Sequence, residues 1–180
     1  REAPVFLSKM TDDSLTRPDE WFTLEIIAEQ NRFITKVNGV VAANCSDPLN
    51  GDTSGHLALQ VWSPKTIVQF RKIEIQELPA TQPVSDDFVT LFNGEDLTGW
   101  KATAELPGQW EVQDGILMGR SRQSYLYSER SDFANFHLRM EVKTNGLGDS
   151  GLYLRAPFAL RHGPRAGLTQ PAGGYEVDLF

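Results

Sequence analysis

Glu176 and Asp178 stand two positions apart in the segment YEVDLF, with Val177 between them and Leu179 after them. In a β-strand, residues i and i+2 point to the same face, and their Cα atoms lie about 6.6–7 Å apart. The two carboxylates would therefore share a face and could form a catalytic pair. The same spacing also describes two solvated side chains on a strand whose Val177 and Leu179 enter the core.

The neighbouring segments predict what else lies on that face. HLALQVW, FHLRMEVKT and SGLYLR alternate between apolar and polar side chains, so each is expected to be a strand with one buried side. If these strands are neighbours, one sheet face gathers aromatic rings, which suit the C–H faces of a sugar, and charged groups, which suit its hydroxyls. The side chains expected on that face are Gln60, Trp62, Arg139, Glu141, Tyr153 and Arg155.

Composition excludes several classes of function. The 180 residues suit one domain with a sizeable core. Acidic residues outnumber basic ones 24 to 17, and a net charge of -7 disfavours binding to nucleic acid or to an anionic membrane. No apolar run is long enough to span a bilayer, and no signal peptide is visible after Arg1. Cys45 is the single cysteine, so no intrachain disulfide is expected.

Strand patterns run through almost the whole chain. Asn38-Gly39 and Asp114-Gly115 lie between strand-like runs, and both dipeptides favour two-residue hairpin turns, whose central residues need positive φ. Residues 67–77 break strict alternation, which predicts a bulge near Arg71. No stretch keeps a helical period over three turns. Many short strands with Gly and Pro turns therefore predict an all-β protein, a sandwich or jelly roll.

A specific family resemblance rests on ordered motifs. FVTLFNGEDLTGW, WEVQDGILMG, DFANFHLRMEVKT, GDSGLYLR and GGYEVDLF follow one another over residues 88–180. Together they resemble the front half of the bacterial 3-keto-disaccharide hydrolases, whose fold is a concanavalin-like jelly-roll sandwich. Residues 19–78 resemble the back half of the same family. The order is therefore inverted, with a back half in residues 1–78, a proline-bearing linker in 79–87 and a front half in 88–180.

Two explanations of the inverted order remain open. The chain could be cut from a tandem array, or it could be a circular permutant in which both halves close one sandwich. A lone half-sandwich would expose a whole apolar face, which disfavours separate halves. We therefore expect one β-sandwich, closed by both halves as a circular permutation.

The resemblance implies cleavage of a (3-keto-)glycosidic bond. A ketone at C3 makes the C2 proton acidic, so one base can start an elimination at C1 without a covalent nucleophile. We expect Glu176, Arg155 and Asp178 to be catalytic, with Glu176 as the base and Arg155 as a clamp that also lowers the pKa of the Glu176 carboxyl. The substrate-binding residues are expected to be Tyr153, Glu141, Arg139, Gln60 and Trp62.

Other interpretations of these residues stay open. The segment EVDLF also resembles the E-x-D-x-E strand of laminarinase-type glycoside hydrolases, but Phe180 stands where their acid/base glutamate would be. That substitution argues against a retaining double-displacement mechanism. Arg155 could be a salt-bridge partner of the carboxylates, and Trp62 could cover a sheet edge. The main functional alternative is a non-catalytic carbohydrate-binding or adhesion module, and a third is a structural spacer.

The expected partner is a carbohydrate, as substrate or ligand, with no nucleic acid and no membrane insertion. His and Cys spacings suit no zinc site, so we expect no metal and no cofactor. The resemblance suggests export to the periplasm or surface of a bacterium. The presence of neighbouring domains in a larger chain stays open.

Overall fold

The computed structural model describes residues 5–9, 15–78, 87–146, 149–162 and 169–179. The described residues form strands and turns in an all-β architecture. They include no helix that is long and apolar enough to cross a membrane. The strands are β1 (Val5–Lys9), β2 (Phe22–Glu29), β3 (Arg32–Val37), β4 (Val40–Ser46), β5 (His56–Val61), β6 (Ile67–Glu77), β7 (Val89–Thr90), β8 (Trp100–Ala102), β9 (Gln109–Gln113), β10 (Ile116–Arg120), β11 (Ser124–Ser128), β12 (Phe136–Thr144), β13 (Ser150–Ala156), β14 (Leu160–His162), β15 (Thr169–Pro171) and β16 (Tyr175–Asp178).

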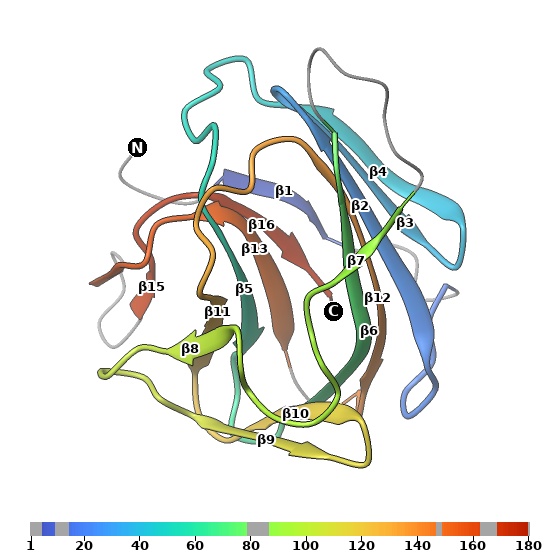
Figure 1. Cartoon of the computed structure of the whole chain (residues 1–180), viewed down its shortest axis with the longest axis vertical. Coiled ribbons are helices and arrows are strands. Elements are labelled where there is room, and N and C mark those ends of the chain that lie inside the picture. Colours follow the sequence, from blue (N-terminus) through green and yellow to red (C-terminus); the bar gives the residue numbers. More distant parts are fainter. Residues whose placement is uncertain (1–4, 10–14, 79–86, 147–148, 163–168, 180) are drawn as a thin grey trace.

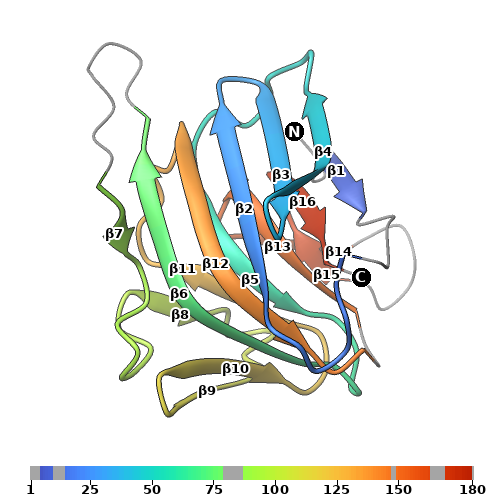
Figure 2. The same cartoon turned by 90° about the vertical axis from the view of Figure 1, so that its right-hand side faces the viewer.

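Two large sheets pack face to face (Figures 1 and 2). The six-stranded sheet has the order β1-β16-β13-β5-β11-β8. The eight-stranded sheet runs β4-β3-β2-β12-β6-β10-β9, with β7 paired to β6. Apart from the parallel pair β1–β16, the neighbouring strands of both sheets are antiparallel. This arrangement is the all-β sandwich that the sequence predicts.

Strands from distant parts of the chain alternate within both sheets. In the six-stranded sheet, β5 lies between β11 and β13, and in the eight-stranded sheet, β12 lies between β2 and β6. Segments before and after residues 79–86 therefore contribute to the same sheets. The expected linker falls largely outside the described residues, and the exchanged order of two family halves stays a prediction.

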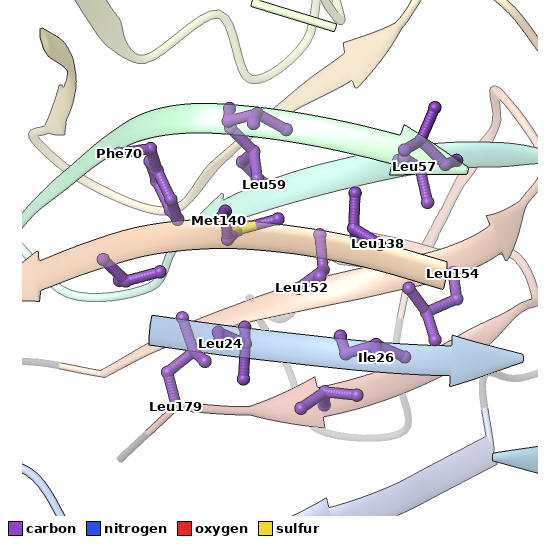
Figure 3. Close-up of a cluster of buried hydrophobic side chains, with 14 of the residues drawn as sticks. Leu24, Ile26, Leu57, Leu59, Phe70, Leu138, Met140, Leu152, Leu154 and Leu179 are labelled. Carbon is purple, nitrogen blue, oxygen red and sulfur yellow. The ribbon is translucent and has the colours of Figure 1, made fainter. Parts of the chain in front are cut away.

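The core fills the space between the sheets (Figure 3). Leu24 and Ile26 of β2 and Leu138 and Met140 of β12 point into it from the eight-stranded sheet. The facing side chains include Leu57, Leu59, Leu152 and Leu154 from β5 and β13. Burying these chains removes apolar surface from water at about 25 cal/mol per Å2, the main stabilising term of such a fold.

Local turn chemistry follows the sequence closely. Asn38 and Gly39 have φ angles of 49° and 79°, and Asp114 and Gly115 have 52° and 76°, so both predicted hairpin turns are confirmed. The predicted bulge near Arg71 is also confirmed. Lys72 has a φ of 51°, and the β6–β12 register shifts beside it.

Candidate active site

Glu176 lies on the face of the six-stranded sheet that points away from the sandwich core, called here the outer face. Its neighbours Val177 and Leu179 are fully buried in the core, as the alternation predicts. Strand register places Glu176 opposite Tyr153, and Tyr153 in turn opposite Ala58 of β5. Glu176 itself is half-buried.

Glu176, Tyr153 and Ala58 form one row across the outer face, and a second row of residues lies beside it. Asp178 lies opposite Gly151, Gly151 opposite Gln60, and Gln60 opposite Tyr125 of β11. Gly151 leaves room for the Gln60 side chain, because a Cβ there would lie 2.8 Å from Gln60 Oε1. The Gln60 amide can thus extend across the sheet toward Glu176.

Hydrogen bonds connect the two rows around the Glu176 carboxyl. The Tyr153 hydroxyl and the Gln60 amide both bond to it. Gln60 Nε2 also lies 3.3 Å from the Tyr153 hydroxyl and 3.5 Å from that of Tyr125. Glu176, Tyr153, Gln60 and Tyr125 therefore form one connected polar group on the outer face.

Burial sets the protonation behaviour of this group. Burial raises the pKa of Glu176, the negative charge of Asp149 raises it further, and the bonds from Tyr153 and Gln60 oppose that rise. Burial also raises the pKa of Tyr125 to about 12 and that of Tyr153 well above its usual range. Tyr153 consequently remains a hydrogen-bond donor at neutral pH, while the ionised Glu176 is a stronger base than an exposed glutamate.

A small apolar layer covers this face. Ala58, Tyr125, Tyr127, Tyr153 and Ala156 form a second buried cluster, on which Leu106 and Leu160 pack. β14 and β15 pair only with each other, and their ribbon is held to the sheet where the Tyr125 hydroxyl donates to the Thr169 carbonyl at 3.0 Å. These contacts cover Tyr125 and Tyr153, which belong to the same polar group as the partly desolvated Glu176 carboxyl.

Arg155 is not part of this group, and its expected place beside Glu176 is wrong. The register of β13 against β5 shifts after Tyr153, and Arg155 has a φ of 51°, so its side chain leaves the outer face. The guanidinium donates to the backbone carbonyls of Ala134, Gln30 and Asp52 at 2.8, 2.6 and 3.2 Å. Only 1% of Arg155 is exposed, and burial lowers its pKa.

The guanidinium therefore does not depress the pKa of Glu176, which is raised instead. Arg155 rests on the rings of Phe33 and Tyr175, with its Cζ 5.1 and 5.9 Å from their centroids. Its contacts tie three backbone segments together at one end of the sandwich.

Arg139 and Glu141 also lie elsewhere, so the expectation that they share the face of Glu176 is wrong. Both belong to β12, in the other sheet, and point away from the core on its far side. There Arg139 pairs with Glu74 at 2.6 Å, and Glu141 pairs with Lys72 at 2.6 Å and with Arg71. Alternation identified their face correctly as the polar one, but the strand belongs to the opposite sheet.

Two other predicted residues lie at the edges of the site. Asp178 is half-buried one row from Glu176. Trp62 follows the end of β5, and its backbone N–H donates to the Asp149 carbonyl at 3.0 Å. Two neighbours of the site, Asp149 and Tyr125, were not among the residues predicted from the sequence. The alternation of SYLYS would have indicated Tyr125.

Among the described residues, no group of three or more His, Cys, Asp or Glu side chains is arranged to hold a metal ion. The geometry thus defines a β-sandwich with a partly buried, hydrogen-bonded carboxyl on one sheet face. The model of the 3-keto-alpha-glucoside-1,2-lyase-like domain matches residues 6–76 and 87–180, and the chain belongs to this family.

A curated relative supports the same family. A 3-keto-disaccharide hydrolase from Bacteroides thetaiotaomicron is 26% identical to this chain over 100 residues. The match covers 48% of this chain and 34% of that protein, so the chain spans about a third of the relative's length. The resemblance read from the ordered motifs is confirmed.

Proposed function

We propose that this chain cleaves 3-keto-α-glucosides by elimination between C1 and C2, with Glu176 as the general base. The observation that carries the proposal is the Glu176 carboxyl itself. It is partly desolvated on a sheet face, has a raised pKa, and bonds to Tyr153 and Gln60. Membership of the 3-keto-alpha-glucoside-1,2-lyase-like family supports the choice of substrate class.

The chemistry needs one base and one donor. Ionised Glu176 removes the C2 proton, and the electron pair of the C–H bond spreads onto the C3 ketone oxygen as an enolate. The enolate re-forms the C3 ketone and gives a C1–C2 double bond while the C1–O bond breaks, and the leaving oxygen takes the proton that Glu176 now carries. Later addition of water across the double bond completes a net hydrolysis.

Tyr153 and Gln60 fit the supporting roles. The Tyr153 hydroxyl, kept protonated by its raised pKa, donates to Glu176 at rest. Once Glu176 carries the C2 proton, that hydroxyl is available to the enolate oxygen, where hydrogen-bond donors stabilise developing charge. Gln60 holds Tyr153 through its amide at 3.3 Å. These roles replace the clamp expected of Arg155.

The test follows proton transfer directly. The wild-type protein is mixed with a 3-keto-α-glucoside deuterated at C2, and the loss of deuterium and the release of the leaving sugar are measured together. Glu176→Gln is expected to abolish both, and Glu141→Gln is the matched control because Glu141 lies on the other sheet. Turnover that survives in Glu176→Gln would contradict the proposal. A wild-type protein that binds glycosides without any deuterium loss would favour a carbohydrate-binding module.

A further inference from the structure

The buried guanidinium of Arg155 has one nitrogen that the described structure leaves unused. Its bonds to the carbonyls of Ala134, Gln30 and Asp52 come from Nε and Nη1. The Nη2 atom, which carries two of the five N–H groups of the side chain, is buried and has no acceptor among the described residues. Buried donors without a partner are rare in native proteins and call for a specific reason.

A cavity adjoins the guanidinium on the side of this unused nitrogen. The cavity has a volume of about 410 Å3, and Gln30 and Ala134 both line it. Ala134 accepts its bond at the Nε edge of the guanidinium plane, and Gln30 accepts its bond at the Nη1 end. In the planar fork, the Nη2 hydrogens lie between that edge and that end. They therefore point between the two residues that separate Arg155 from the cavity.

The wall of the cavity favours a negatively charged ligand. Among the described residues, the wall consists of Gln30, Asn50, Thr53, Ser54, Ala134 and Asn135. These residues supply amide and hydroxyl groups, and none of them is acidic, although the chain has a net charge of -7. The Asp52 carboxylate, which attracts Arg155, accepts the Gly174 N–H at 3.1 Å and is not part of this wall.

The backbone at Arg155 gives a second reason to expect a ligand here. Its φ of 51° lies in the left-handed region, which arginine seldom adopts. Residues held in such conformations cluster at ligand sites, where the surrounding structure maintains the strain. The three carbonyl bonds account for the position of the guanidinium, but they leave the Nη2 hydrogens without a role.

We propose that this cavity binds an oxyanion, a carboxylate or a phosphate group, whose oxygens accept the Nη2 hydrogens of Arg155. The planar fork of arginine suits both groups. The hydroxyls of Thr53 and Ser54 donate to the remaining oxygens, and the exposed side chain of Gln30 turns aside to admit the ligand. The site is separate from Glu176, and the inference does not rest on the elimination proposed above.

The experiment measures dissociation constants by isothermal titration calorimetry at constant ionic strength. The probes are inorganic phosphate and sodium gluconate, which carries a carboxylate. Thr53 is exposed and lines the cavity, so Thr53→Asp and Thr53→Asn should both fold and differ by one charge. Thr53→Asp is expected to bind the anion at least about tenfold more weakly than Thr53→Asn, because two like charges about 6 Å apart repel each other by that much. Thr23→Asp adds the same charge on β2 and should bind as the wild type does.

Each outcome decides the inference. Saturable binding of either probe that only Thr53→Asp weakens supports the site, and the tighter probe shows whether its ligand is a carboxylate or a phosphate. Equal affinities in Thr53→Asp and Thr53→Asn, or no saturable binding to the wild type, overturn the inference. Calorimetry needs no turnover, so a wild type that binds an anion without cleaving 3-keto-α-glucosides would contradict the proposed function alone.

Discussion

Replacing Arg155 with methionine is expected to lower the free energy of unfolding by about 3–5 kcal/mol, because three backbone carbonyls lose their hydrogen-bond donor. Methionine keeps apolar contact with the Phe33 and Tyr175 rings, so the loss comes mainly from the guanidinium. Its Nε and Nη1 atoms donate to three backbone carbonyls, at 2.8, 2.6 and 3.2 Å, and these carbonyls would lose their donors. Each hydrogen bond to a charged group contributes about 1.5–3 kcal/mol to stability. The variant also avoids the cost of burying the guanidinium, and this saving offsets part of the loss.

The assay is chemical and thermal denaturation followed by tryptophan fluorescence. For a chain of this size, about 3–5 kcal/mol corresponds to a fall of about 6–20 °C in Tm. Arg155→Lys should lie between wild type and methionine, because one ammonium cannot reproduce the planar fork. Arg139→Met is the matched control. It breaks a partly exposed pair with Glu74, and such pairs contribute about 0–1 kcal/mol.

A refuting result is easy to recognise. If Arg155→Met denatures within about 1 kcal/mol of the wild type, the guanidinium does not hold the three segments together. If the same variant folds normally and loses all turnover, Arg155 belongs to the chemistry after all.

Three further predictions concern other buried positions. Burial raises the folded-state pKa of Glu176 above its ordinary 4.5, so the wild type gains stability as pH falls through that raised value and Glu176→Gln does not. At neutral pH the wild type buries a charged carboxylate that Glu176→Gln lacks. The unfolding free energy of the wild type should therefore rise relative to that of the variant from neutral to acidic pH, and a constant difference between the two would contradict the raised pKa. Gly55→Ala should cost about 3 kcal/mol in denaturant titration, because its Cβ would lie 2.4 Å from the Arg155 carbonyl carbon. Asp47→Ala should also cost about 3 kcal/mol, since Asp47 accepts the Tyr175 hydroxyl at 2.8 Å and caps the backbone N–H groups of residues 49 and 51. A Tm equal to that of the wild type would show that water replaces this carboxylate.

Side-chain alternation predicted which residues of a single strand face the core and which face outward. Within β16, the apolar positions Val177 and Leu179 enter the core, and Glu176 faces outward, because successive side chains of a pleated strand alternate. The hairpin turns at residues 38–39 and 114–115 could also be predicted from the sequence, since few residue pairs tolerate two positive φ angles.

Pairing between strands was not predictable in the same way. Arg139 and Glu141 alternate as cleanly as Tyr153, but nothing in their own segment shows which sheet takes the strand. Long-range partners decide that, and β12 pairs with β2 and β6, away from β13 and β16.

Arg155 shows a second limit. Alternation holds only while the register holds, and a shift after Tyr153 with a positive φ at Arg155 sends the next side chain to the end of the sandwich. A large charged residue gives no sequence signal for a left-handed backbone, where glycine or asparagine is typical. The expected position of Arg155 beside Glu176 was wrong for this reason. The catalytic assignment of Glu176 stays a proposal.

The interleaving of distant strands has a consequence for vectorial synthesis. β5 pairs with β11 and β13, and the inner edges of β2 and β6 pair with β12, all of which leave the ribosome later. At about 5–20 residues per second, the stretch from Glu77 to Thr144 takes roughly 3–13 s to make. During that interval the earlier strands have exposed edges and apolar faces that can pair with another nascent chain. Yield in a cell should therefore depend on the spacing of translating ribosomes and on chaperones that shield β5 and β6 until β12 emerges.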